Sequence, residues 1–185
     1  MDTLTQKQRH NNMAAIRSRN TKPELMVRRW LWSRGFRYRL NSPRLPGHPD
    51  LVLRKYRTCI FVNGCFWHGH KTEVVEGTLV SADNDSLPLL KDSDCFRLPK
   101  TNRPFWTRKI LRNMARDEQE QRQLAKMGWH CITIWECELK PQKRERTLTA
   151  LEYTLNHIYL QDHTAGYPPI DEEQDYDVAA ESVTP

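Results

Sequence analysis

The chain has 185 residues, enough for one domain with a substantial hydrophobic core, and no stretch approaches the roughly 18 apolar residues of a membrane span. The net charge of +6 hides a strong asymmetry, because residues 1–160 hold all 29 Lys and Arg residues but only 16 of the 23 acids, a net charge of +13. Solubility does not require such an excess, so it indicates a partner with a phosphate backbone. The five cysteines form an odd set behind a polar amino terminus, which argues against a disulfide framework and favours the cytoplasm.

Residues 1–20 are polar and basic, and we expect them to form an arm that lies on DNA. The basic side chains predicted to bind DNA there are Lys7, Arg9, Arg17 and Arg19. A helix follows, because Thr21 can cap it and Glu24 occupies the capping-box position. This predicted helix ends near Ser33 and opens the main domain, which we place at residues 21–160.

Two short apolar runs, at residues 50–53 and 59–62, follow a Pro-rich loop and predict an antiparallel pair of strands joined by a tight turn. Residues 71–94 differ in kind, since they carry six acids against two lysines. We interpret this segment as an irregular acidic loop inserted into the domain.

The periodicity beyond the insertion predicts a long helix over about 105–127, a strand over 129–135 and a helix over about 142–160. Residues 161–185 contain seven acids and no Lys or Arg, which predicts a disordered acidic tail. Helices that alternate with antiparallel strands predict an α/β fold in which helices flank a mixed sheet.

The most informative stretch is residues 65–70, which combine a thiol, two imidazoles and two large aromatic rings at the end of a predicted strand. Cys65 and His70 have residue types and spacing that suit one tetrahedral zinc ion. His68 would then remain available for acid–base chemistry near neutral pH, with Phe66 and Trp67 displayed beside it. The alternative is a strand end with a buried thiol, surface histidines and packed aromatic rings.

Asp50 is the candidate ligand for a hard cation. It opens a strand directly after Pro49, and a carboxylate held in this way can bind Mg²⁺. The neighbouring strand contains no Glu-x-Lys motif, but the backbone carbonyl of Val62 could complete the site. The alternative is a turn or capping aspartate.

Six segments, taken in chain order, resemble one known family. They are Arg17-Ser-Arg-Asn-Thr-Lys-Pro-Glu24, Leu45-Pro-Gly-His-Pro-Asp50, Val62-Asn-Gly-Cys-Phe-Trp-His-Gly-His70, Leu98-Pro-Lys-Thr101, Phe105-Trp106, and Gly128-Trp129 with Trp135-Glu-Cys137. Together they look like the very-short-patch repair (Vsr) endonucleases. The resemblance runs from about residue 7 to 160 and is interrupted only by residues 71–94.

The resemblance implies a restriction-endonuclease-like fold of the PD-(D/E)XK type with one structural zinc. It also implies an enzyme that nicks one DNA strand on the 5′ side of the thymine in a T:G mismatch, the product of 5-methylcytosine deamination. By this resemblance, Asp50 and the Val62 carbonyl would hold Mg²⁺ at the scissile phosphate. His68 would act as acid or base with Glu24 in support, and Asn63 would stand where the family commonly has a second histidine.

The resemblance further implies a zinc set of Cys65, His70, Cys95 and Cys137. In the family the third ligand follows the histidine almost at once, whereas 24 residues separate His70 from Cys95 here, and Cys131 is the natural substitute. Three rings match the aromatic residues that the family inserts beside the mismatch, namely Phe66, Trp67 and Trp106.

Other expectations follow from the same family. The partner would be double-stranded DNA with a T:G mismatch, MutL-type repair proteins could join it, and the enzyme would be a monomer without a membrane anchor. It would act in a bacterial-type cytoplasm and associate with the nucleoid when bound. Two alternatives stay open: an endonuclease of the same fold that needs no mismatch, and a zinc-stabilised DNA-binding protein without catalysis.

Overall fold

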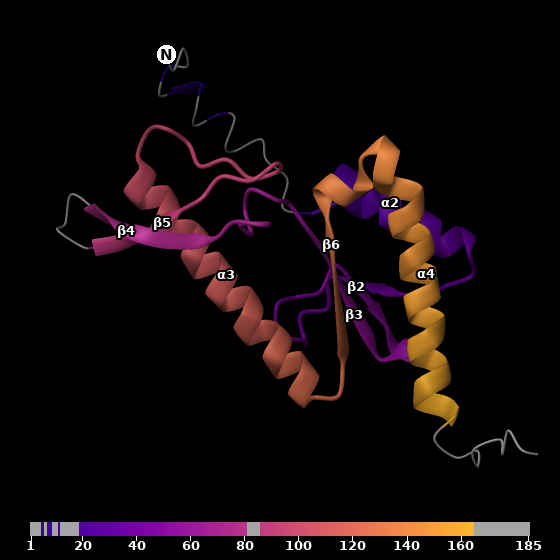
Figure 1. The fold of residues 1–185 in the computed structure, drawn as a ribbon. Helices are drawn as coiled ribbons and strands as arrows, with labels where there is room; N and C mark the ends of the chain where they lie inside the picture. The colour runs from indigo at the N-terminus through magenta and orange to yellow at the C-terminus, as the bar shows by residue number, and fades with distance from the viewer. Residues whose placement is uncertain (1–4, 6, 9–10, 12–18, 81–85, 165–185) are drawn as a thin grey trace, which may run out of the picture.

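The computed structural model describes residues 5, 7–8, 11, 19–80 and 86–164. Its central sheet has the strand order β1-β2-β3-β6, in which β1, β2 and β3 are antiparallel neighbours and β6 runs parallel to β3 (Figure 1). The strands of this sheet are β1 (Arg39–Leu40), β2 (Leu51–Leu53), β3 (Thr58–Asn63) and β6 (His130–Trp135). The helices are α2 (Lys22–Ser33), α3 (Arg103–Lys126) and α4 (Pro141–Thr164), with two 3₁₀ turns, η1 (Arg54–Tyr56) and η2 (Glu136–Leu139). The prediction of a mixed sheet flanked by helices is confirmed.

Helix α2 begins where the capping pattern predicts. The Thr21 hydroxyl accepts a hydrogen bond from the Glu24 backbone N–H at 3.4 Å and donates one to Glu24 Oε1 at 3.0 Å. The first contact satisfies a backbone N–H that a helix amino terminus otherwise leaves without a partner, and the second joins the two side chains. The chain leaves the helix at Gly35, whose φ of +85° suits a residue without a side chain.

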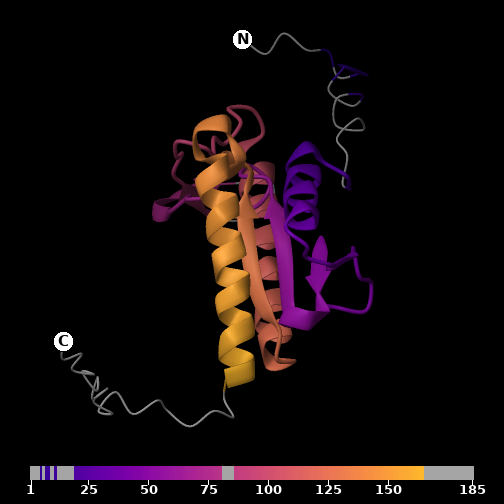
Figure 2. The ribbon, with the colours of Figure 1, turned by 90° about the vertical axis from the view of Figure 1, so that its right-hand side faces the viewer.

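The two faces of the sheet bury alternate residues of each strand against different helices. Figures 1 and 2 show α2 and α4 side by side on one face and α3 on the other. Strand residues that face α2 and α4 are Leu51, Leu53, Ile60 and Ile134. Those that face α3 are Val52, Cys59 and Cys131, packed with Leu124. Each fully buried aliphatic side chain contributes roughly 1.5–3 kcal/mol, so this alternation fixes the register of the sheet.

The parallel pairing of β3 and β6 brings two distant segments of the chain together at the carboxyl ends of these strands. Asn63 pairs with Trp135 at the last position of both strands. The two chains leave the sheet side by side from this point, and Cys65 and Cys137 each lie two residues further on. Strand pairing therefore places the loop after β3 next to η2.

The prediction for residues 71–94 is wrong in one respect. These residues do not form an irregular loop but include an antiparallel hairpin of β4 (Val74–Val80) and β5 (Ser86–Leu90), with a bulge between Val75 and Thr78. Valines and leucines supply enough β-forming character for the two strands, a signal that the surrounding acids obscured. Leu90 anchors the hairpin by packing against Ile110 of α3.

Two further boundaries differ from the prediction. Helix α4 continues to Thr164, so residues 161–164 are helical rather than part of a disordered tail, and residues 165–185 lie outside the described residues. Most of the predicted basic arm, including Arg9 and Arg17, also lies outside them. None of the helices in the described part of the chain combines the length and apolar character that a membrane span needs.

Candidate active site and metal centre

A cleft of about 550 Å³ lies where the amino terminus of α2, the start of β2, the end of β3 and the middle of α3 meet. All five residues predicted for catalysis or for the magnesium site line it: Glu24, Asp50, Val62, Asn63 and His68. Of the predicted DNA-binding residues, Arg19 also lines the cleft, whereas Lys7 is exposed on the arm.

Asp50 sits at the floor of the cleft, and its carboxylate is held by the neighbouring strand. The Val62 backbone N–H donates a hydrogen bond to Asp50 Oδ2 at 2.8 Å. Burial, assisted by the nearby Glu24 carboxylate, raises the pKa of Asp50 to about 6 against the opposing effects of this hydrogen bond and of Arg28. A carboxylate in such a position is short of positive charge, which suits a hard cation.

Glu24 is only 3% exposed, and its carboxylate is held by three donors. Oε2 accepts hydrogen bonds from the Asn20 backbone N–H at 2.9 Å and from the guanidinium of Arg28 at 2.8 Å, while Oε1 accepts one from Thr21. Thr21 is thus the N-cap, as predicted, whereas the Glu24 side chain accepts from the backbone N–H of Asn20 rather than from that of Thr21, which a capping box requires. Its place in the cleft also keeps a second negative charge close to Asp50.

His68 forms a close contact with Asp117 of α3, between Nδ1 and Oδ2. Both side chains are about one-fifth exposed and line the cleft. Because Asp117 accepts a hydrogen bond from Nδ1–H, Nε2 is the ring nitrogen that remains for proton exchange in the cleft.

Asp117 was not among the predicted site residues, although the sequence contains a signal for it. The apolar stripe of α3 runs through Ile110, Met114 and Leu124, and helical spacing puts residues 117 and 121 on the same stripe. These two positions hold Asp117 and Gln121, and both line the cleft. Polar residues at positions of an otherwise apolar stripe therefore indicate the part of this helix that faces the cleft.

The loop before β2 closes the cleft against α3. Gly47 has a φ of +70°, and a side chain at this position would lie 2.8 Å from Glu120 Oε2. His48 lines the cleft beside it. Burial raises the pKa of Glu120, so this wall also carries a poorly solvated carboxylate that the sequence pattern did not identify.

Three rings predicted to enter DNA form one cluster at the end of the cleft, which we call the aromatic cluster: Phe66, Trp67 and Trp106. Ring centroids are 5.1 Å apart for Phe66–Trp67, 5.2 Å for Phe66–Trp106 and 6.1 Å for Trp67–Trp106. The rings are half-buried rather than fully displayed, because Phe66 also packs against Phe96. Only Trp67 reaches the cleft itself.

Two polar residues of α3 contact the aromatic cluster. The Asn113 side-chain amide donates a hydrogen bond to the Trp67 carbonyl at 2.8 Å. The Lys109 ammonium lies 5.2 Å from the Trp67 ring centroid and 5.5 Å from that of Trp106. This cation over two aromatic faces adds positive charge where stacked bases and phosphates would approach.

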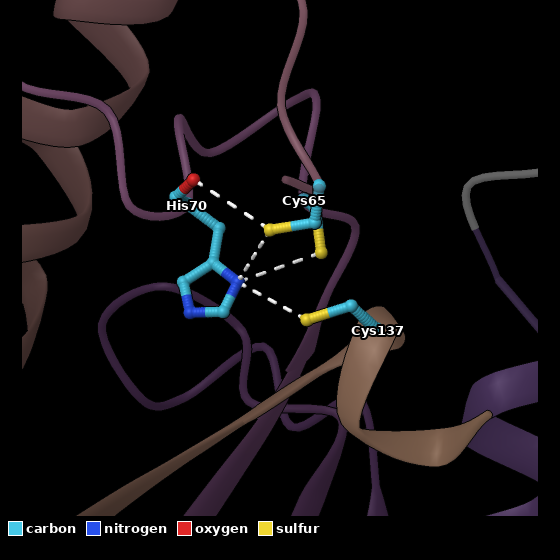
Figure 3. Close-up of side chains that lie close together, drawn as sticks. Cys65, His70 and Cys137 are labelled. Atoms are coloured by element: carbon cyan, nitrogen blue, oxygen red, sulfur yellow. Dashed lines mark hydrogen bonds between the residues drawn. The ribbon is translucent and has the colours of Figure 1, made fainter. Parts of the chain in front are cut away.

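A separate group of sulfur and nitrogen atoms converges where the loop after β3 meets η2 (Figure 3). The Sγ atoms of Cys65, Cys95 and Cys137 lie 3.6, 3.3 and 3.4 Å from His70 Nδ1. All four possible ligand atoms lie within 4.8 Å of one another. The predicted set of four residues therefore meets at one point, and the substitute, Cys131, lies on the face of β6 that packs against α3.

The chemistry of this four-residue set fits a metal ion. Burial raises the pKa of Cys65 to about 12, and the neighbouring thiols contribute to the same direction. Burial also lowers the pKa of His70, which keeps the imidazole neutral as a ligand must be. Three cysteine sulfur atoms that converge on one imidazole nitrogen match the Cys₃His set of structural zinc sites.

The chain is similar to known proteins of one family. The family profile described as DNA mismatch endonuclease Vsr matches residues 1–74. The chain is 40% identical over 139 residues to the type II nicking enzyme V.NmeAIP of Neisseria meningitidis, covering 75% of this chain and 84% of that protein. It is 37% identical over 157 residues to the type II nicking enzyme V.XorIIP of Xanthomonas oryzae, covering 85% and 96%.

A third relative is the DNA mismatch endonuclease Vsr of Escherichia coli, which is 32% identical over 136 residues that cover 74% of each chain. Matches of this identity and coverage are too extensive to arise from one shared motif. The chain therefore belongs to the Vsr family of DNA mismatch endonucleases, and it is a DNA endonuclease.

Proposed function

We propose that this endonuclease nicks one strand of duplex DNA on the 5′ side of the thymine in a T:G mismatch, in a reaction that requires Mg²⁺. The observation that carries the proposal is the shared cleft, in which Asp50, the His68–Asp117 pair and Trp67 meet. The Escherichia coli relative is named a DNA mismatch endonuclease, which supports a mismatch as the substrate. A mixed sheet with the reactive carboxylate at a strand start also agrees with a restriction-endonuclease-like fold.

Asp50 and the carbonyl of Val62 are the groups that would hold Mg²⁺. When bound there, the ion would polarise the scissile phosphate and lower the pKa of its bound water. The protein's own contribution is the Asp50 carboxylate. Burial and the nearby Glu24 destabilise its negative charge, so that a bound cation would stabilise it. Asn63, which is mostly buried and lines the same cleft, can donate a hydrogen bond to a phosphate oxygen.

The His68–Asp117 pair supplies the proton chemistry. Asp117 fixes one tautomer and one orientation of the imidazole, so that Nε2 can take a proton from the attacking water. The same geometry stabilises the imidazolium that then forms, because the carboxylate lies against Nδ1. General base catalysis of this kind contributes about 10²- to 10⁴-fold in rate.

The aromatic cluster accounts for the preference for a mismatch. Flat apolar rings can replace base stacking when a base step opens, and a mispaired step opens at a lower free-energy cost than a matched one. Each stacked ring is worth about 1–3 kcal/mol. The Cys₃His set would hold zinc as a structural ion, because four protein ligands leave no open position for a substrate.

The test is strand-specific cleavage mapping on duplexes that differ only at one base pair. With Mg²⁺ present, we expect a single nick 5′ of the thymine in T:G duplexes and none in the matched T:A duplex. Equal cutting of matched and mismatched DNA would instead support a mismatch-independent endonuclease. Tight binding of the mismatch without cleavage under any divalent cation would support a DNA-binding protein without catalysis.

A further inference from the structure

The imidazole of His70 lies flat against the indole of Trp135. The two ring centroids are 4.0 Å apart and the ring planes differ by only 4°. His70 Nδ1 points from this stack toward the three cysteine Sγ atoms. The stacked geometry therefore holds the plane of the imidazole parallel to the indole, in the orientation from which Nδ1 faces the sulfur atoms.

A metal-binding histidine is ordinarily oriented by a hydrogen bond from its second ring nitrogen to a carboxylate, a carbonyl or water. Among the residues that the structure describes, none forms a hydrogen bond with Nε2 of His70. The backbone of His70 is anchored, since its N–H donates to the Cys65 carbonyl at 2.9 Å and its carbonyl accepts from Ser93. The side-chain ring itself stacks on the indole of Trp135.

Trp135 is itself held firmly, as an orienting group must be. It occupies the last position of β6, where it pairs with Asn63 of β3. Its backbone N–H donates a hydrogen bond to Glu138 Oε2 at 3.1 Å, and Cys137 follows two residues later. Trp135 thus lies at the carboxyl end of β6, two residues before Cys137 and beside the end of β3, from which the chain continues to Cys65.

We propose that Trp135 is a positioning residue for the metal centre, which holds the ring plane of His70 in the orientation that ligation needs. This inference rests on the proposed zinc site. An orienting partner of a metal ligand is worth about 10- to 100-fold in metal affinity, because the ring otherwise loses rotational freedom on binding. A flat ring of another type should do the same work, whereas an aliphatic side chain should not.

The experiment is a Co²⁺ titration of the metal-free full chain, followed by competition with Zn²⁺. Visible absorption of Co²⁺ in a tetrahedral sulfur-rich site reports the geometry directly. We expect Trp135→Leu to weaken Co²⁺ affinity by about 10- to 100-fold and to broaden the absorption bands. Trp135→Phe should stay within about threefold of the wild-type chain. Trp32→Leu serves as the matched control, because Trp32 is 56% exposed and takes no part in the centre.

Wild-type affinity and unchanged bands in Trp135→Leu would overturn the inference, whereas a wild-type chain that binds no Co²⁺ would overturn the zinc proposal itself. A second measurement needs no variant. In the wild-type chain, the carbon-bound ring protons of His70 should show upfield NMR shifts from the indole face, both with and without metal. Ordinary shifts for these protons in the metal-free chain would also contradict a preset ring.

Discussion

The cleft and the Cys₃His centre depend on the same pair of strands but differ in how well their charges are satisfied. Both begin where β3 and β6 end, at Asn63 and Trp135. At the centre, four donor atoms converge within 4.8 Å. In the cleft, Asp50 has a pKa raised to about 6 because it is buried near a second carboxylate. One site brings four possible protein ligands together, and in the other a buried carboxylate lies near a second negative charge.

This difference separates the roles of the two sites. A closed set of four ligands supports the fold, since no position is free for a substrate. An incompletely satisfied carboxylate destabilises the folded chain slightly and is retained where chemistry needs it. Replacing a ligand of the Cys₃His centre should therefore lower the unfolding free energy of the chain, whereas replacing Asp50 in the cleft should raise it.

The largest effect is expected at the centre. Cys137→Ser should lose the metal and lower the unfolding free energy by about 4 kcal/mol, or roughly 8–16 °C in Tm. Metal analysis and thermal unfolding measure both quantities. Cys131→Ser is the control, because Cys131 lies in the same strand region but packs against α3, and it should keep its metal. A metal-free Cys137→Ser chain with an unchanged Tm would remove the structural role of the ion.

The second effect concerns the rate of cleavage. Asp117→Asn should reduce single-turnover cleavage by about 10²- to 10⁴-fold, because the amide no longer fixes the His68 tautomer that takes the proton. DNA affinity should remain within a factor of two or so of the wild-type value. Glu118→Gln is the matched control, since Glu118 is an exposed neighbour on the same helix. Equal rates for both variants would show that the pair has no part in catalysis.

The third effect is on discrimination rather than on rate. Trp106→Leu should reduce the ratio of mismatched to matched DNA binding by about 5- to 150-fold, the equivalent of one lost stacking contact. Competition binding with the two duplexes measures the ratio, which cancels any general loss of folded protein. A variant that weakens binding to both duplexes equally would place Trp106 in the core alone.

The smallest effect follows from the pKa of Asp50. Because burial raises this pKa above its value in the unfolded chain, the protonated form is favoured by folding, and stability is lost as pH rises from about 4 through 6. Without Mg²⁺, Asp50→Asn should therefore raise the unfolding free energy by about 1–2 kcal/mol at pH 8 and by almost nothing below pH 4. Denaturant unfolding at the two pH values measures it. A less stable variant at pH 8 would contradict the electrostatic account of the cleft.

Much of the site could be predicted from sequence because its chemistry is local. Cys65, His68 and His70 lie within six residues, and the Pro-Asp dipeptide marks the strand start. Cys95 could be assigned to the centre only through resemblance to a family, and the hairpin that precedes it explains how the chain leaves and returns. The hairpin itself was missed because acids outnumber lysines there and masked the aliphatic strands.

Asp117 was missed for a different reason. Its partner, His68, is 49 residues away in the chain, and only the packing of α3 on the loop after β3 brings them together. Helical periodicity places Asp117 on the apolar stripe, but it does not say which histidine the stripe will meet. Burial likewise decides the pKa of Asp50, and burial depends on how the three layers assemble.

The most direct test of the central claim is one comparison of the wild-type chain with Asp50→Asn, in which strand-resolved cleavage of a T:G duplex is measured in Mg²⁺ and thermal unfolding of the same protein preparations is measured at pH 8 without Mg²⁺ or DNA. The account predicts that the wild-type chain makes one nick 5′ of the thymine, and that the variant makes none while it still binds the duplex and melts at a higher temperature without Mg²⁺. Cleavage by the variant at the wild-type rate, or a loss of stability in place of a gain, would contradict it.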